Sequence, residues 1–223
     1  LAVFTEDSDA HFGYIDRPVR IVDQWTYNNS LYRAGAFVSE MPNLELVQLT
    51  SFGCGLDAVT ADQVEEILGS KSRMYTLIKI DEGSNLGAVR IRIRSLIAAV
   101  KERNRHKREV VRKSAAFPRQ VFTKEMKYSH TIIAPQMSPI HFRLLQRAFQ
   151  CSGYNFVILP EVDTLAVETG LQFVNNDACY PSILVAGQMI AALKSGKYDL
   201  DHVSLLITQT GGGCRATNYI GLI

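Results

Sequence analysis

The chain has 223 residues, of which 47% are hydrophobic and 21% charged, and this is the composition of a globular protein with its own core. Its 24 basic and 22 acidic residues nearly cancel, so the total charge does not indicate nucleic acid, and four cysteines are too few for a disulfide-rich secreted scaffold. This cysteine content favours a reducing cytoplasm. We also expect no membrane span, because the longest apolar stretches, such as 183–193, fall short of the roughly 20 residues that a bilayer requires.

The first half of the chain alternates predicted strands and helices, as is typical of a parallel sheet. Thr60 is a suitable N-cap and Gly69 a suitable stop for one of these helices. Alternating arginine and apolar residues at 87–94 fit a strand, but 95–100 fits a helix, and we favour a helix over 87–100. The other predicted elements are a helix at 30–40, a strand at 44–50, a helix at 61–68 and a strand at 75–80.

The marked charge run of the chain follows at 101–108 and continues with Arg112 and Lys113. We predict a solvated helix end and a basic linker there. Contact with nucleic acid is the less favoured alternative, because no aromatic residue interleaves with the charges. Residues 114–122 are predicted to continue as a linker.

The second half repeats the order of strand and helix. It begins with a strand at 131–134 and a helix that has Ser138 as N-cap, Pro139 in its first turn and an end near Cys151. The remaining predicted elements are a strand at 156–159, a helix at 182–193 and a strand at 203–208.

The fold class predicted from these elements is α/β, with two Rossmann-like lobes whose sheets are mainly parallel. The first lobe spans 1–113 and carries the basic helix and linker, and the second spans 114–223. We expect a fragment of a larger protein, because the chain starts at Leu1 and a helix begins at 216–223 without a stop signal.

Three of the four cysteines lie in loops flanked by glycine or proline. Cys54 and Cys214 follow predicted strands, at the sheet edge where open α/β proteins build their sites, and glycines beside them let a cofactor approach the backbone. Cys179 lies two residues before Pro181, near a predicted helix start whose dipole favours a thiolate. Three thiolates suit an iron-sulfur cluster with one open iron, or zinc with a further ligand. We therefore predict Cys54, Cys179 and Cys214 as metal ligands.

Other candidate residues carry weaker signals. Cys151 is predicted to pack at the end of an amphipathic helix. The five histidines are scattered, and none has metal-ligand spacing from a cysteine. The glycine-rich stretch at 210–213 lacks the P-loop and dinucleotide patterns, and the polar stretch at 81–85 fits a turn better than an acid or a substrate contact.

Three segments, at 46–57, 175–181 and 208–219, resemble the cysteine segments of the 2-hydroxyacyl-CoA dehydratase superfamily. They are most similar to those of large activase-fused proteins whose carboxyl-terminal regions resemble its subunits. The segments at 80–88 and 134–139 fit the same group. The resemblance covers most of the chain beyond Trp25.

This resemblance implies that Cys54, Cys179 and Cys214 hold a 4Fe-4S cluster or a double-cubane variant. The cluster would accept low-potential electrons from an ATP-dependent activase and serve a dehydratase-like lyase, or a reductase of small molecules. Implied partners are the activase, an acyl-CoA or small-molecule substrate, and a second copy of the chain. Neither a membrane nor nucleic acid is expected as a partner, and no catalytic residue is assigned.

The chain departs from the family in the order of its cysteines. Cys54 stands in the first half and the other two in the second, whereas the family's ligands are expected within one folded subunit. The three cysteines therefore serve one site, two sites or a site shared across a dimer. The leading alternative function is a cluster-free structural or docking lobe, followed by a structural zinc site and by binding of an acidic partner or nucleic acid at 101–113.

Overall fold

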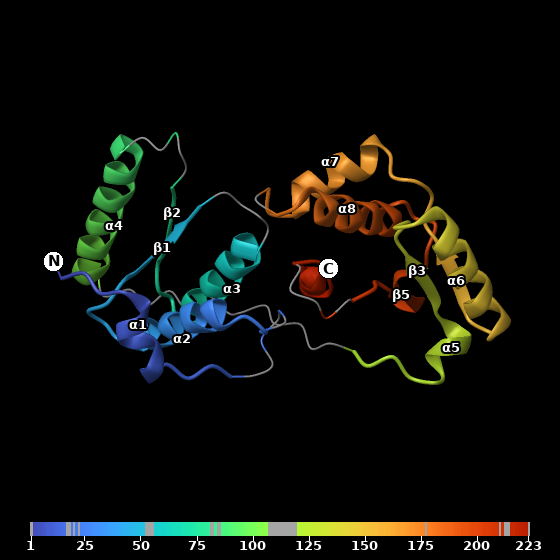
Figure 1. Cartoon of the computed structure of the whole chain (residues 1–223), viewed down its shortest axis with the longest axis horizontal. Coiled ribbons are helices and arrows are strands. Elements are labelled where there is room, and N and C mark those ends of the chain that lie inside the picture. The colour runs from blue at the N-terminus through green and yellow to red at the C-terminus, as the bar shows by residue number, and fades with distance from the viewer. Residues whose placement is uncertain are drawn as a thin grey trace. The chain divides into compact units, whose positions relative to one another are not determined.

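Helices and two short parallel sheets make up the computed structural model of this chain (Figure 1). It divides into two compact units, Leu1–Ala116 and Phe117–Ile223. The predicted α/β class with parallel strands is confirmed. The structure describes residues 2–16, 19, 21, 23–51, 56–80, 83, 86–106, 120–176, 178–209, 211 and 215–222.

The first unit contains a β-α-β arrangement in which β1 and β2 pair in parallel, from Leu46 opposite Tyr75 to Thr50 opposite Lys79. The predicted strands at 44–50 and 75–80 are therefore confirmed with slightly shorter bounds. The elements are α1 (Glu6–Asp9), η1 (Ala10–Phe12), α2 (Thr26–Glu40), β1 (Leu46–Thr50), α3 (Leu56–Ser70), β2 (Tyr75–Lys79) and α4 (Leu86–His106).

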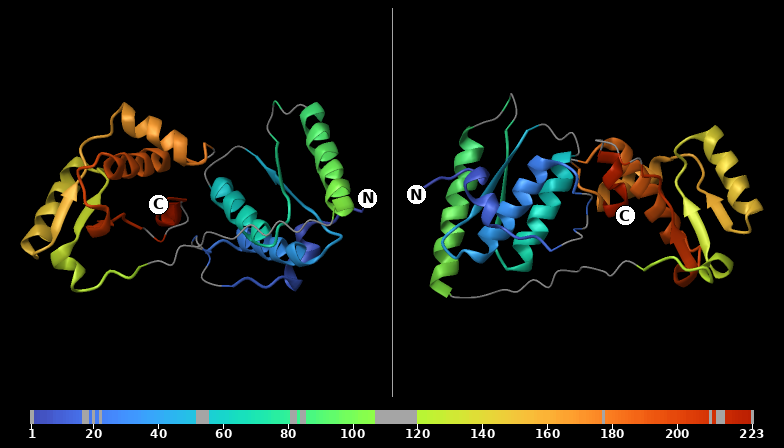
Figure 2. Two further views of the ribbon diagram at one scale, coloured as in Figure 1. Left: turned by 180° about the vertical axis from the view of Figure 1, so that it is seen from behind. Right: turned by 60° about the horizontal axis from the view of Figure 1, so that its bottom comes forward.

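The β1–β2 pair lies between α4 on one side and α2 with α3 on the other (Figures 1 and 2). The helix α4 contacts β2, in which Thr76 and Ile78 are buried. Their partners in β1, Val47 and Leu49, are exposed. The alternate side chains of β1, on the side of α2 and α3, are buried: Leu46, Gln48 and Thr50.

The helix starts of this unit differ from the predicted ones. α2 begins at Thr26, and α3 begins at Leu56, so Thr60 is inside α3 and the prediction of Thr60 as N-cap is wrong. The Thr60 hydroxyl instead accepts a hydrogen bond from Nδ2 of Asn28, which joins α3 to α2. Gly69 lies one residue before the end of α3 and is not a cap.

Residues 87–100 are helical, as we favoured over a strand. In α4 the spacing of Val89, Ile93 and Leu96 places these apolar residues on one helical face. Residues 101–106 continue the same helix, with exposed Lys101 and Arg105. Most of the predicted linker, 107–119, lies outside the described residues.

Tyr32 is fully buried in α2, near Thr60 and Asn28. Burial raises the pKa of Tyr32 to about 12, and the nearby polar side chains of Thr60 and Asn28 offset only part of this effect. The folded state therefore favours the neutral phenol, whereas the unfolded chain ionises near the ordinary pKa of about 10. Burial likewise raises the pKa of Tyr75 well above its usual range.

We expect the free energy of unfolding to fall as the pH rises from 10 toward 12, with Tyr32 contributing about 2 kcal/mol of this loss, because its pKa is raised in the folded state. Below pH 10 the phenol is neutral in both states, so Tyr32 should not affect the pH dependence there. Denaturant unfolding of the wild type and of Tyr32→Phe, measured between pH 8 and 11.5, tests this. The variant should show a shallower alkaline decline. Tyr27→Phe, at an exposed position, should follow the wild type. Parallel pH curves for the wild type and Tyr32→Phe would contradict the role of Tyr32.

The second unit contains a parallel sheet with strand order β4-β3-β5. The central β3 matches the predicted strand at 131–134, and its position explains why Ile132, Ile133 and Ala134 are all buried. The elements are α5 (Met126–Ser129), β3 (Thr131–Ala134), α6 (Pro139–Cys151), β4 (Asn155–Ile158), α7 (Thr164–Phe173), α8 (Tyr180–Lys194), η2 (Leu200–His202), β5 (Val203–Leu205), η3 (Arg215–Asn218) and α9 (Tyr219–Leu222).

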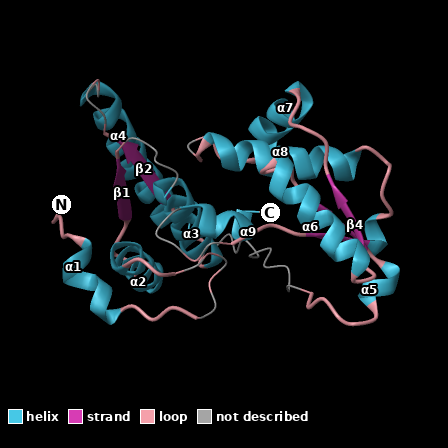
Figure 3. Ribbon diagram, turned by 45° about the vertical axis from the view of Figure 1, so that its right-hand side comes forward, coloured by secondary structure: helices cyan, strands magenta, loops and turns pink. Residues whose placement is uncertain are grey.

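The helix α6 packs against β4 (Figure 3). Phe149 of α6 stacks on Phe156 of β4 with ring centroids 4.6 Å apart. The predicted bounds of α6 and its N-cap residue Ser138 are confirmed, although the Ser138 hydroxyl bonds to Nδ1 of His141 rather than capping the helix. Cys151 is exposed, so its predicted packing role is wrong.

A helix that the sequence did not predict, α7, packs against α8 (Figure 3). Asp163 caps it by accepting a hydrogen bond from the Ala166 N–H. The backbones of the two helices approach closely at Gly170 and Gly187, where a Cβ on Gly187 would lie 2.0 Å from the carbonyl oxygen of Ala166. Gly170 lowers the helix propensity of α7, but its missing side chain permits α7 to pack against α8.

Candidate functional site

Of the three cysteines predicted as ligands, Cys179 lies within the described residues. Cys54 and Cys214 lie outside them, as do most of the polar stretch at 81–85 and of the glycine-rich stretch at 210–213. By position in the chain, Cys54 belongs to the first unit and the other two cysteines to the second.

Cys179 is the N-cap residue of α8 and is 8% exposed. Its carbonyl oxygen accepts hydrogen bonds from the N–H of Ser182 at 2.8 Å and of Ile183 at 3.3 Å, and from the Ser182 hydroxyl at 2.7 Å. Pro181 lies in the first turn of α8, as its sequence position indicates. Cys179 thus lies at the positive end of the α8 dipole, as predicted, although α8 starts at Tyr180 rather than Ser182.

The Cys179 thiol meets a residue from a distant part of the chain. Its Sγ lies 2.7 Å from the hydroxyl oxygen of Tyr219, the first residue of α9, and both side chains are buried. The helix α9 also contacts α8. In the sequence, Cys214 is followed directly by η3 and then by Tyr219. The chain therefore reaches Cys179 five residues after Cys214.

The carboxyl edge of the β4-β3-β5 sheet is tied to the middle of α8. The Gln188 side chain accepts a hydrogen bond from the N–H of Gln136, after β3, at 3.0 Å, and it donates one to the carbonyl oxygen of Pro160, after β4. After β5, the Thr208 hydroxyl lies 3.7 Å from Sδ of Met137. The strand order changes direction between β3 and β5, and ligands of open α/β sheets bind at such positions. The segment that leads to Cys214 therefore starts from this edge.

Two histidines lie near the amino edge of the same sheet. Nδ1 of His130 is 2.9 Å from the Ser204 hydroxyl oxygen, and Nδ1 of His202 is 2.8 Å from the Asp199 carboxylate. Their ring centroids are 5.8 Å apart. The hydrogen bond from His202 lowers the pKa of Asp199. Because the histidines are 72 positions apart, no sequence motif joins them.

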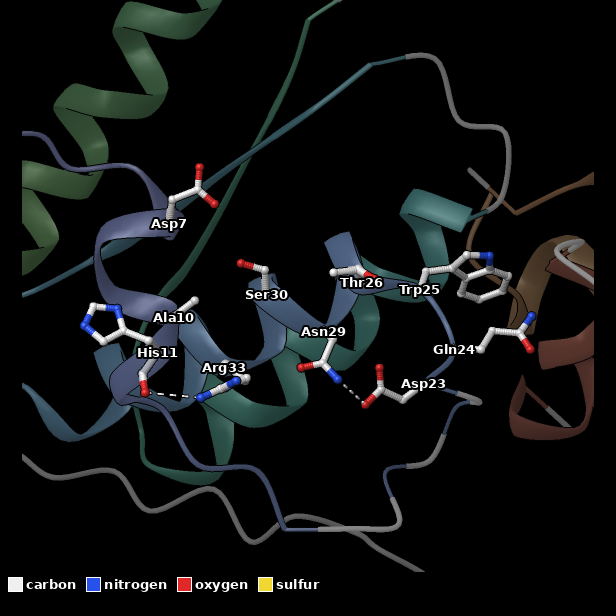
Figure 4. Close-up of a pocket in the computed structure, with 10 residues that line it drawn as sticks. All are labelled: Asp7, Ala10, His11, Asp23, Gln24, Trp25, Thr26, Asn29, Ser30 and Arg33. Carbon is white, nitrogen blue, oxygen red and sulfur yellow. Dashed lines mark hydrogen bonds between the residues drawn. The ribbon is translucent and has the colours of Figure 1, made fainter.

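A pocket of about 400 Å³ lies over the amino-terminal half of α2 in the first unit (Figure 4). Asn29 donates a hydrogen bond to Asp23 at 2.9 Å, and Arg33 donates to the carbonyl oxygens of His11 and Gly13 at 3.1 Å. These hydrogen bonds hold the segments that precede α2 against this helix. The lining residues contain none of the predicted ligands and are Asp7, Ala10, His11, Asp23, Gln24, Trp25, Thr26, Asn29, Ser30 and Arg33.

Within the part of the chain that the structure describes, no group of three or more His, Cys, Asp or Glu side chains is arranged to hold a metal ion. In the same part, no helix is long and apolar enough to cross a membrane. The position of Cys179 at the N-terminus of α8 favours a thiolate and so agrees with a metal-ligand role, whereas its burial against the Tyr219 phenol is equally typical of a packed structural thiol. Tyr219 was not predicted as a site residue, because its contact arises only in the fold.

Comparisons of the chain with protein-family models, with curated proteins and with solved structures find no match.

Proposed function

We propose that the chain is an iron-sulfur module of a 2-hydroxyacyl-CoA dehydratase-like system or of an ATP-driven low-potential reductase. Cys179 and Cys214 would ligate one 4Fe-4S-type site in the second unit, and Cys54 would belong to a separate site in the first. The observation that carries this proposal is the contact between Cys179 and Tyr219, because it joins the segment that follows Cys214 to the start of α8.

We also propose that the chain consists of two Rossmann-like lobes joined by a basic linker. The order β1-α3-β2 in the first unit and β3-α6-β4 in the second, each with a parallel pair, supports the likeness of the two lobes. In such folds a cofactor lies beyond the carboxyl ends of the strands. The connection from this edge toward Cys214 in the second unit agrees with that position.

A bound cluster would supply one-electron chemistry at low potential. The chain's residues contribute the setting for it. The amino-terminal end of α8 stabilises negative charge on the Cys179 sulfur, and the burial of Cys179 and Tyr219 keeps water away from that sulfur. An activase is the proposed electron donor, and an acyl-CoA or another small molecule the proposed acceptor.

Iron and acid-labile sulfide, measured per chain after anaerobic purification and reconstitution, test this function. We expect about four irons for each complete cubane, with visible absorbance that bleaches in air. Zinc without iron would replace the proposal by a structural zinc site. A protein that holds neither metal would instead support the cluster-free structural or docking lobe.

A further inference from the structure

We infer that α4 carries a docking surface for an acidic amphipathic helix of a protein partner. The surface is a basic stripe that consists of four exposed side chains: Arg90, Arg94, Lys101 and Arg105. It lies in the first unit and contains no cysteine, so the inference does not depend on the proposed iron-sulfur function.

The spacing of the four cations along α4 places them in one row. Arg90 and Arg94 are four residues apart, as are Lys101 and Arg105, so the members of each pair are neighbours on the helix surface. The second pair follows the first by eleven residues, which is close to three turns of about 3.6 residues. The basic stripe is therefore about 22 Å long, because each residue adds about 1.5 Å to a helix.

The carboxylates near α4 leave most of the basic stripe unbalanced. The helix contains six arginine or lysine residues and one acidic residue, Glu102. Glu102 lies 3.7 Å from Arg105, and both side chains are more than half exposed. Glu45, directly before β1, forms an ion pair with Arg103, which is not part of the stripe. The first pair of the stripe is at least eight positions from Glu102, so no helical neighbour of opposite charge balances it.

This arrangement opposes the stability of α4 itself. Like charges four residues apart on a helix repel each other, and the basic stripe contains two such pairs. The first turn of α4 contains no acidic residue, so the positive end of the helix dipole adds to the charge of Arg90 just beyond it. A row of cations that its own helix disfavours is explained by an anionic partner that balances it.

Apolar side chains beside the basic stripe favour a protein partner over nucleic acid. Leu86 is 71% exposed and lies four residues before Arg90, and Ile91 is 66% exposed and lies three residues before Arg94. Protein interfaces bury such apolar groups beneath a charged rim. The helix α4 contains no aromatic side chain on which a base could stack, and the net charge of +2 provides no broad positive field. A helix with carboxylates along one edge and apolar residues beside them matches both features.

A labelled helical peptide tests the surface. Its glutamates have the spacing of the basic stripe, leucines lie beside them, and its anisotropy is measured with the full chain at low and physiological salt. We expect binding that weakens with salt, because the cations are exposed. Arg90→Gln/Arg94→Gln should bind the peptide about fivefold more weakly. Its thermal midpoint should equal or slightly exceed that of the wild type, because two like charges are removed.

The matched control is Arg143→Gln/Arg147→Gln, because these arginines are also exposed and four residues apart but belong to α6. It should bind the peptide as the wild type does. The inference is overturned by no peptide binding at low salt, by equal weakening in both double variants, or by a lower thermal midpoint of Arg90→Gln/Arg94→Gln. Tighter binding of a labelled DNA duplex than of the peptide also overturns it, in favour of a nucleic-acid surface. Iron content does not enter these outcomes, so the inference and the proposed function fail separately.

Discussion

The Cys179→Ser variant is expected to lose the iron bound by the second unit while keeping its fold. Serine is a favoured N-cap residue, so α8 should still begin at Tyr180. A serine hydroxyl, however, is not the soft thiolate ligand that iron-sulfur clusters require. Iron and sulfide per chain, with thermal unfolding measured on the same samples, separate loss of metal from loss of structure.

Three further serine variants sharpen this test. Cys214→Ser should remove the same iron as Cys179→Ser, so the variant with both changes should lose no more iron than either alone. Cys54→Ser should remove iron from the separate site of the first unit, and its loss should add to that of Cys179→Ser. Cys151→Ser is the matched control, because that thiol is exposed and outside the proposed ligand set. Wild-type iron content in Cys179→Ser would contradict the ligand role of Cys179.

Gly187→Ala is expected to lower the free energy of unfolding by about 3 kcal/mol or more, because overpacking at a backbone contact cannot be relieved by a side-chain rotation. The added Cβ would lie 2.0 Å from the Ala166 carbonyl oxygen and 2.6 Å from the Gly170 nitrogen. The helices α7 and α8 would have to separate. Since α8 begins at the Cys179 cap, iron content should fall as well.

Gly69→Ala is the control for this substitution. Gly69 lies within α3, and the space around its added Cβ is open for 4 Å. The change should leave stability unchanged or raise it slightly, because alanine has the higher helix propensity. Thermal unfolding of both variants measures the difference. Equal midpoints for Gly187→Ala and the wild type would show that the close approach of α7 and α8 is not a tight contact.

The sequence predicted the elements in which local signals agree with the final environment. The apolar run at 131–134 is the central strand β3, and Ser138 with Pro139 marks the start of α6. Pro181 likewise places Cys179 at a helix start. In each case the residue preference depends on the nearest few positions, so the sequence is sufficient.

Elements that depend on a partner from elsewhere were missed or misplaced. Thr60 has the side chain of an N-cap, but α3 begins earlier, at Leu56, and the Thr60 hydroxyl bonds to Asn28 of α2 instead. Gly170 argues against a helix by propensity, yet α7 forms because this glycine packs against α8. Cys151 fits an apolar helix face in the sequence but is left exposed.

The sequence by itself determined the α/β class, in which strands and helices alternate along the chain. It also placed Cys179 at the start of a helix. Both follow from periodicity and capping, which are local properties. The tertiary structure alone decided that Tyr219 lies beside the Cys179 sulfur and that Gln188 ties α8 to the ends of β3 and β4. These contacts join residues 28 to 52 positions apart. They form only when packing of the helices and strands determines which buried polar groups meet.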